Sequence, residues 1–353
     1  MQQDYFKGKG AQINTSNRFE KHKLSFDHQE GLDEQLLREK PKTEVFFETP
    51  KKIISRNDSP DLPFDYSVNP YQGCEHGCIY CYARNSHEYW GFSAGLDFET
   101  KIIVKKDAPR LLEEAFLKKS WKPSRLMLSG NTDCYQPLEK RFELTRAILK
   151  VCLRYRNPVG LITKNALVTR DIDVLKELAS HRLVHVYLSI TTLDEKLRQL
   201  MEPRTASAAK KLEAIRVMSE EGIPVGVMNA PIIPGLNHHE IPQVLQESSK
   251  AGALSAGYSV VRLNGKVAEL TKDWLEKNFP DRAKKVWNQI GELHGGQVND
   301  SEFGRRQSGA GNYADIIQQL YQRAKVKYFE GKKMPDTDLT HFRRGGNYSL
   351  FGD

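Results

Sequence analysis

The sequence has no long apolar run, few cysteines and no apolar start. None of its apolar stretches approaches the roughly 18 residues that cross a bilayer, and its mean hydropathy is -0.59. The first residues are polar, unlike the apolar region of a signal peptide. Five cysteines among 353 residues, an odd number, argue against a secreted disulfide framework. We therefore expect no membrane segment and a cytoplasmic location.

A second C-x2-C pair, which would indicate a zinc knuckle, is also missing. Instead, three of the cysteines fall close together, as Cys74-x3-Cys78-x2-Cys81. Each iron of a [4Fe-4S] cubane takes one protein ligand, so three thiolates leave one iron open to a small molecule. The spacing predicts Cys74, Cys78 and Cys81 as cluster ligands. The alternative is a zinc site that adds His76 or His87 to the three cysteines.

The chain is basic, with a formal net charge of +8 and an isoelectric point near 9.0. Basic surfaces attract polyanions, because neutralising phosphates releases counterions and a cleft of one sign steers association. The charge therefore favours a nucleic acid partner. The alternative is that the lysines and arginines are scattered over the surface and serve solubility.

The pattern of apolar residues divides the chain into three regions. Residues 1–60 are polar and predict an N-terminal extension, and residues 266–353 predict a helical C-terminal extension with a tail, its helices at 274–293 and 313–329. Residues 61–265 alternate short apolar runs with amphipathic stretches, which is typical of a parallel sheet in an α/β protein. The predicted strands are 66–69, 125–129, 159–164, 184–190, 225–230 and 257–263, and the predicted helices between them are 108–118, 141–155, 172–179, 206–220 and 240–249.

Right-handed crossovers would close these units into a partial (β/α)6 barrel of the TIM type. In such a barrel the active site lies at the carboxyl ends of the strands. The cysteine motif follows the first predicted strand, so it is expected at this end.

The cysteine motif has aromatic neighbours, in the order Cys74-x3-Cys78-x-Tyr80-Cys81-Tyr82. It resembles the signature of the radical S-adenosylmethionine (SAM) superfamily. That resemblance implies a [4Fe-4S] cluster, SAM bound at its open iron, and a one-electron donor of the flavodoxin or ferredoxin type. The reduced cluster would cleave SAM to a 5′-deoxyadenosyl radical, which abstracts hydrogen from a substrate.

Within the superfamily, about residues 60 to 265 are similar to the spore photoproduct lyase-like group, through the cysteine motif, Thr132-Asp133, Thr163-Lys164 and Ser189. The similarity implies contacts with SAM from residues at successive strand ends. The expected contacts are Tyr80 near the adenine, Gly130, Thr132, Lys164, Ser189, Arg204 and Gly235. The alternatives are a solvated Lys164, an ion pair of Arg204 with Glu202 or Glu195, and a simple Pro-Gly turn at Gly235.

In the lyase, a cysteine just before the Thr/Ser-Asp pair donates hydrogen to the product radical, assisted by a tyrosine after the third cluster cysteine. Tyr82 matches the tyrosine, but Gly130 stands at the cysteine position. Cys134 is therefore a candidate for a displaced catalytic donor, with a structural cysteine as the alternative. Cys152 lies on the apolar face of a predicted helix and is expected to be buried.

The leading hypothesis is a radical SAM enzyme with one [4Fe-4S] cluster that acts on DNA or a nucleic-acid lesion. One alternative is a radical SAM enzyme that modifies a protein or small metabolite. Another is a non-enzymatic, zinc-stabilised module that binds nucleic acid. At the C-terminus, the segment from Asn347 to Phe351 resembles the short peptide with which repair proteins dock on the sliding clamp, unless the tail folds back onto the barrel.

Overall fold

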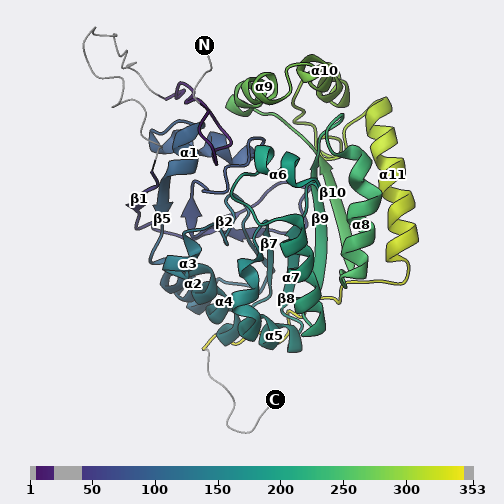
Figure 1. Cartoon of the computed structure of the whole chain (residues 1–353). Helices are drawn as coiled ribbons and strands as arrows, with labels where there is room; N and C mark the ends of the chain where they lie inside the picture. The colour runs from purple at the N-terminus through teal and green to yellow at the C-terminus, as the bar shows by residue number, and fades with distance from the viewer. Residues whose placement is uncertain (1–4, 20–41, 346–353) are drawn as a thin grey trace, which may run out of the picture.

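A mostly parallel sheet, curved into a partial barrel, forms the centre of the computed structural model, which describes residues 5–19 and 42–345 (Figure 1). Its strand order is β10-β9-β8-β7-β6-β3-β2, and β2 alone pairs antiparallel, with β3. The strands are β2 (Ile54–Arg56), β3 (Tyr66–Val68), β6 (Leu126–Leu128), β7 (Val159–Thr163), β8 (Val184–Ser189), β9 (Val225–Ile232) and β10 (Ser255–Val260). The predicted α/β partial barrel is confirmed.

The predicted strands correspond to the parallel strands of the sheet. Central strands such as β8, with five of its six residues buried, are covered on both faces and form continuous apolar runs. The last strand differs most from its prediction, because it begins at Ser255 rather than 257 and ends at Val260 rather than 263. Its pairing with β9 shifts register between Tyr258 and Val260, which ends the regular ladder early.

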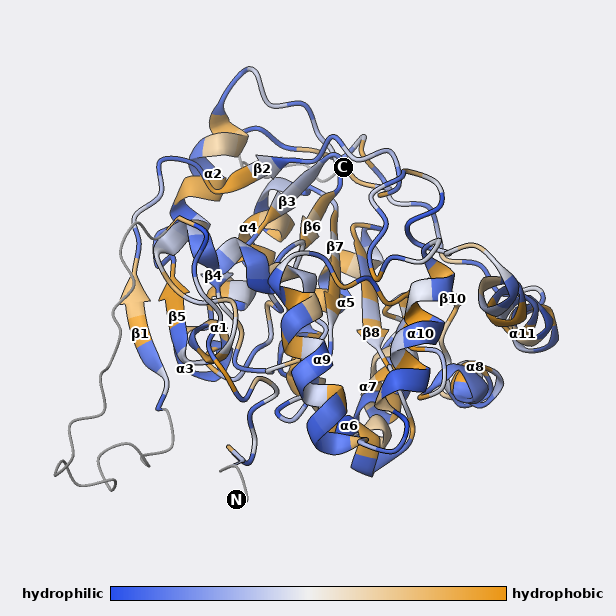
Figure 2. Ribbon diagram, turned by 90° about the horizontal axis from the view of Figure 1, so that it is seen from above, coloured by the Kyte–Doolittle hydropathy of each residue, from blue (hydrophilic) through white to orange (hydrophobic). Residues whose placement is uncertain are grey.

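Helices between the strands cover the outside of the sheet, as Figures 1 and 2 show. They are α2 (Ala108–Leu117), α4 (Leu144–Tyr155), α5 (Ile172–Ser180), α7 (Ala208–Glu220) and α8 (Ile241–Lys250). The start of the helix predicted at 141–155 is wrong. Residues 139–142 form a separate turn, α3 (Glu139–Phe142), and the φ of 50° at Glu143 separates this turn from α4. The Glu139 carboxylate then accepts the N–H of Thr145 in the first turn of α4.

The N-terminal region contributes to folded structure in three places. β1 (Glu44–Phe47), β5 (Lys101–Val104) and β4 (Tyr71–Gln72) form a small second sheet in the order β1-β5-β4. β2 forms an edge of the main sheet. Residues 8–17, here called the N-terminal segment, run beside α1 (Leu96–Thr100), where the N–H of Leu96 donates to the carbonyl of Ile13. The boundaries at 60 and 265 stay predictions.

The C-terminal region is helical, with α9 (Lys266–Asn278), α10 (Ala283–Leu293) and α11 (Asn312–Phe329). The single helix predicted at 274–293 is therefore wrong, and the break falls at Phe279-Pro280, where proline cannot donate the next helical hydrogen bond. After α11 the chain passes the amino ends of the strands, where the N–H of Arg343 donates to the carbonyl of Tyr155. None of the helices in the described part could cross a membrane. The segment from Asn347 to Phe351 lies outside the described residues.

Candidate functional site

The cysteine loop joins β4 to a 3-10 helix, η2 (Tyr82–Trp90), and is held from two sides. The N–H of Cys74 donates to the carbonyl of Phe98 at 2.9 Å, and the N–H of Ile79 donates to the carbonyl of Met201 at 3.0 Å. Gly77 has a φ of 68°, and a Cβ there would lie 2.7 Å from the Glu99 carboxylate. The loop conformation therefore requires glycine at this position.

The three thiols of this loop are free and close enough to influence one another. Cys74 and Cys78 are 6% and 7% exposed. Burial raises the pKa of the Cys74 thiol well above its usual range, and the neighbouring charges of Asp133, Cys78 and Cys81 raise it further. A cubane binds each thiolate through a different iron, so the sulfurs need to surround a cluster rather than meet at one point. Three neighbouring thiols on one buried loop fit that requirement.

The zinc alternative requires four ligands around a single ion. Across residues 5–19 and 42–345, no three His, Cys, Asp or Glu side chains are arranged in that way. His76 lies with Nδ1 3.3 Å from Asp133 and Nε2 3.4 Å from the Asn165 amide. His87 is fully buried against Phe98, and burial lowers its pKa to about 4. Both histidines thus contact residues other than the three cysteines.

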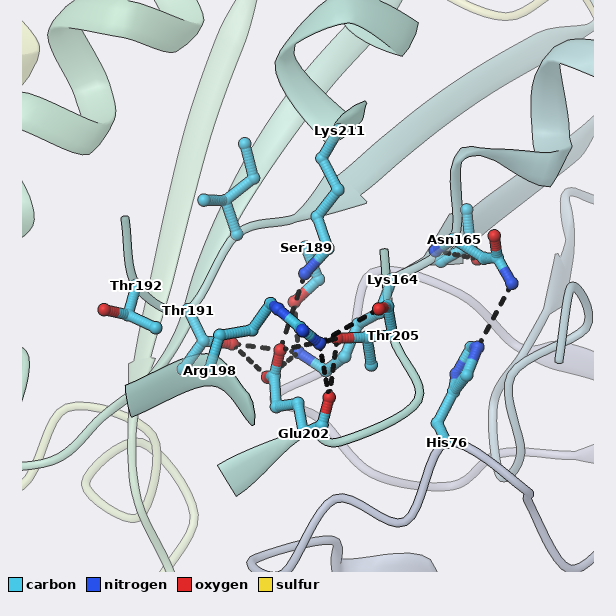
Figure 3. Close-up of polar contacts among 12 residues, drawn as sticks. His76, Lys164, Asn165, Ser189, Thr191, Thr192, Arg198, Glu202, Thr205 and Lys211 are labelled. Carbon is cyan, nitrogen blue, oxygen red and sulfur yellow. Dashed lines mark hydrogen bonds and ion pairs between the residues drawn. The ribbon is translucent and has the colours of Figure 1, made fainter. Parts of the chain in front are cut away.

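Beside the cysteine loop, Lys164 joins the carboxyl ends of three strands. Its ammonium donates to Ser189 Oγ at 2.6 Å, to Thr191 Oγ1 at 3.1 Å and to the Ala230 carbonyl at 3.2 Å (Figure 3). It also pairs with Glu202 Oε1 at 3.1 Å. The predicted contacts Lys164 and Ser189 are thus brought together, and the Lys164 side chain, which is 16% exposed, is a paired ammonium rather than a solvated one.

Glu202, in the turn after α6 (Glu195–Met201), binds groups from both sides of the site. Its side chain is fully buried, accepts from the hydroxyls of Tyr80 and Thr191, and pairs with Lys211 of α7 at 3.4 Å. Burial alone would raise the pKa of Glu202, but Lys164 and Lys211 together hold it well below its usual range. We call Tyr80, Lys164, Thr191, Glu202 and Lys211 the Glu202 network.

Asp133 and Thr132 hold the loop after β6 against its neighbours. The Asp133 carboxylate accepts from Thr163 Oγ1 at 2.7 Å and from the N–H of Lys164 at 2.8 Å. It therefore fixes the end of β7, from which the Lys164 side chain starts. The Thr132 hydroxyl is buried and donates to the Tyr71 carbonyl at 2.7 Å, and its contact with SAM stays a prediction.

Tyr82 and Gly130 meet at the edge of the site. Tyr82 is 52% exposed, and its hydroxyl donates to the Gly130 carbonyl at 2.7 Å. A Cβ on Gly130 would lie 2.9 Å from Cβ of Ser67 on β3, so a larger residue there requires a shift of the loop. The two positions that the lyase-like resemblance connects therefore touch, although one of them has no side chain.

Three further predicted residues have other surroundings. Cys134 is fully buried within the main apolar core, so its role as a hydrogen donor stays a prediction. Arg204 pairs with Glu75 at 3.1 Å, not with the Glu202 or Glu195 of the ion-pair alternative, and its contact with SAM stays a prediction. Gly235, with a φ of 75°, lies against Gln289 of α10.

The sequence prediction missed Thr191 and Lys211 as site residues and placed Glu202 only in an ion pair with Arg204. One signal was available. The buried positions of α7 are Ala208, Lys211, Ala214, Ile215 and Met218, so a lysine interrupts an apolar stripe. A lysine at such a position is almost never fully buried unless it is paired.

A comparison with protein families decides the class of the protein. The family model described as the radical SAM superfamily matches residues 68–247, just over half of the chain. The chain belongs to the radical SAM superfamily. It is therefore a radical SAM enzyme, of a family that uses SAM and a [4Fe-4S] cluster, and the hypothesis of a non-enzymatic zinc module is wrong.

Curated relatives of this radical SAM enzyme are uncharacterized proteins. One from Mycobacterium tuberculosis is 32% identical over 222 residues, which is 62% of this chain and 65% of the relative. The match thus spans less than two thirds of the mycobacterial protein's length. One from Methanocaldococcus jannaschii is 29% identical over 248 residues, which is 70% of this chain and 88% of the relative.

Solved structures with the same fold include spore photoproduct lyase complexed with dinucleoside spore photoproduct. Its TM-score is 0.59 at 15% identity, with 81% of this chain and 80% of that chain covered. A mutant of the lyase with bound AdoMet and dinucleoside spore photoproduct has a TM-score of 0.52 at 16% identity, with the same coverage. At this identity the likeness shows the fold.

Proposed function

We propose that this radical SAM enzyme acts on a damaged base in nucleic acid, with Cys74, Cys78 and Cys81 as the cluster ligands. When bound, the cluster and SAM supply a 5′-deoxyadenosyl radical that abstracts hydrogen from the substrate. The observation that most supports a lyase-like reaction is the contact of Tyr82 with Gly130. By the resemblance, Tyr82 corresponds to the tyrosine that assists hydrogen donation in the lyase-like group, and its side chain is half-exposed.

The chain's own side chains orient SAM in this proposal. Tyr80 belongs to the cysteine loop, and the Lys164 Nζ lies 5.7 Å from its ring centroid and donates to Ser189. The Lys164 ammonium suits a carboxylate as a point charge. Gly130, Thr132, Arg204 and Gly235 remain proposed contacts from the resemblance alone. The electron would come from a partner of the flavodoxin or ferredoxin type. A sliding-clamp partner has no support in the comparisons, and we do not propose it.

Two observations support a nucleic-acid substrate. The net charge of +8 favours a phosphate backbone. Among proteins of the same fold is a lyase solved with a dinucleoside photoproduct. A base within a duplex is out of reach of any radical at the cluster, so the enzyme would have to extrude it from the stack. The alternative is a protein or small-metabolite substrate, which requires no such extrusion.

We expect 5′-deoxyadenosine formation that depends on a lesion. The measurement is anaerobic reconstitution with iron and sulfide, followed by quantification of 5′-deoxyadenosine with dithionite and SAM, in the presence of UV-irradiated DNA. Undamaged DNA of the same sequence is the control, and DNA binding should weaken steeply with salt. Equal turnover with irradiated DNA, undamaged DNA and no DNA would contradict the nucleic-acid proposal and favour the alternative.

Replacing Tyr82 by Phe keeps the ring and removes the hydroxyl. If the phenol helps return hydrogen to the product, we expect product formation to fall by roughly tenfold, about 1.4 kcal/mol of barrier, while SAM cleavage continues. Tyr89→Phe is the matched control, because that ring is 70% exposed. Cys134→Ala, assayed alongside, tests the displaced donor: loss of product with continued SAM cleavage would support it. An unchanged product yield in Tyr82→Phe would remove the proposed role of the phenol.

A further inference from the structure

We propose that Glu202 is a positioning residue of the SAM site, and that Lys211 is the dedicated counter-ion that keeps it charged. This inference rests on the proposed role of Lys164 in binding the SAM carboxylate. It goes further because neither Glu202 nor Lys211 is among the residues that the cysteine motif or the strand ends indicate.

The two oxygens of the Glu202 carboxylate face different parts of the protein (Figure 3). Oε1 faces the cysteine loop and the strand ends. It accepts from the Thr191 hydroxyl at 2.5 Å, pairs with Lys164 at 3.1 Å and accepts from the Tyr80 hydroxyl. Oε2 meets the outer helix layer, through Lys211 at 3.4 Å. One carboxylate therefore connects the cysteine loop, β7 and α7.

Lys211 is costly to bury and is paired with Glu202. It is 1% exposed on the buried face of α7. Burial lowers its pKa, and the Glu202 carboxylate partly offsets that effect. An apolar residue of similar size would pack at this position without a desolvation penalty. A structural role alone therefore does not explain why a charge stands here.

The neighbouring carboxylate cannot take the place of Glu202. Asp133 accepts from Thr163, from the backbone of Lys164 and lies 3.3 Å from His76, so its oxygens are already engaged. The Lys164 and Lys211 ammoniums thus share Glu202 as their common partner. When a ligand carboxylate attracts Lys164, Glu202 retains Lys211 on its other oxygen and is never left as an unpaired buried charge.

This arrangement predicts what each substitution does to SAM binding. In Lys211→Met, Lys164 becomes the sole ammonium paired with Glu202. A ligand that draws Lys164 away would then leave the buried Glu202 carboxylate without an ammonium beside it. In Glu202→Gln, Lys164 and Lys211 lose their common counter-charge, and one of the two accepting oxygens becomes an NH2 group that cannot accept. We expect the SAM dissociation constant to rise about tenfold or more in either variant. Lys211→Arg keeps the charge and is expected to remain within about threefold.

The experiment measures SAM binding, not turnover. Wild type and variants are reconstituted anaerobically, iron and sulfide are quantified per chain, and the SAM dissociation constant is measured by equilibrium dialysis. The change that SAM causes in the EPR signal of the reduced cluster gives a second readout. Glu213→Gln is the control, since Glu213 is 57% exposed and pairs with Arg216 on the outer face of α7, away from Glu202. Cluster content should be equal in all variants.

A SAM dissociation constant within twofold of wild type in Lys211→Met, at equal iron content, would overturn the inference. Because Lys211→Met retains Glu202, its SAM dissociation constant tests the inference even if Glu202→Gln does not fold. No nucleic acid is needed, so a wrong substrate class leaves the result unaffected. Failure of the wild type to bind SAM would instead remove the proposed cofactor site itself, and the inference with it.

Discussion

Cys78→Ala is expected to reduce 5′-deoxyadenosine formation to background and to lower the bound iron. The cysteine loop supplies three thiols, and a cubane left with two protein ligands has a second open iron and is lost readily. No other cysteine can replace the missing thiolate, because Cys134 and Cys152 are fully buried in the main core. Iron and sulfide per chain, the EPR spectrum after reduction, and the 5′-deoxyadenosine yield measure the effect.

Cys152→Ala is the matched control for this experiment. It removes a thiol of the same kind, which packs in α4 with the apolar core, and it should cost roughly 1 kcal/mol of stability through the small cavity that is left. Cluster content and SAM cleavage should stay at the wild-type level. Retention of full iron and full turnover in Cys78→Ala would refute the assignment of the three ligands.

The fold could be predicted from the sequence because periodicity reports burial directly. Strands such as β7 and β8 are covered on both sides and read as uninterrupted apolar runs. The errors fall where a local contact overrides periodicity. The Glu139 carboxylate binds the N–H of Thr145 and restarts a helix, and Pro280 divides what looked like one long helix.

Only those site residues that lie at the carboxyl ends of strands could be predicted from the sequence. Lys164 directly follows β7 and Ser189 is the last residue of β8, so parallel pairing of the two strands brings them together. Glu202 and Lys211 are nine residues apart on a turn and a helix, and nothing in their spacing indicates that they pair with each other or that Glu202 also contacts Lys164. Similarly, Arg204 pairs with Glu75 of the cysteine loop rather than with a carboxylate near it in sequence. Partners that meet through tertiary packing leave no periodic signal.

The N-terminal segment, which belongs to the polar stretch predicted as an extension, packs against the cysteine loop. The buried Glu99 carboxylate accepts the N–H groups of Gly10 and Ala11 at 3.1 and 2.8 Å. It also pairs with Arg84 at 2.5 Å. A Cβ on Gly10 would lie 1.8 Å from the Gly77 carbonyl oxygen, so the two backbones touch. Three distant parts of the chain thus meet at one carboxylate.

Arg84 supplies the positive charge that balances the buried Glu99 carboxylate. It and Glu99 are both fully buried. Besides pairing with Glu99, its guanidinium donates to the carbonyl of Cys78 at 2.9 Å and to those of Ala94 and Gly95. It therefore fixes the backbone of a proposed cluster ligand directly.

Arg84→Met is expected to lower the free energy of unfolding by about 3 to 5 kcal/mol, because it leaves the Glu99 carboxylate buried without its counter-charge. The variant should also lose cluster iron, since the Cys78 carbonyl loses its donor. Anaerobic denaturant unfolding and iron content measure the two effects. Arg216→Met is the control, because that guanidinium pairs with Glu213 and Glu220 on the exposed face of α7.

A double variant distinguishes the charge pairing of Arg84 with Glu99 from the hydrogen bond that Arg84 donates to the Cys78 carbonyl. Arg84→Met combined with Glu99→Gln removes both charges, so it should recover part of the stability that Arg84→Met loses. It should not recover the iron, because the Cys78 carbonyl still lacks its donor. Gly10→Ala should lower iron as well, since its methyl group would push the N-terminal segment away from Gly77. If Arg84→Met and Gly10→Ala both keep wild-type iron, the N-terminal segment has no part in holding the cysteine loop.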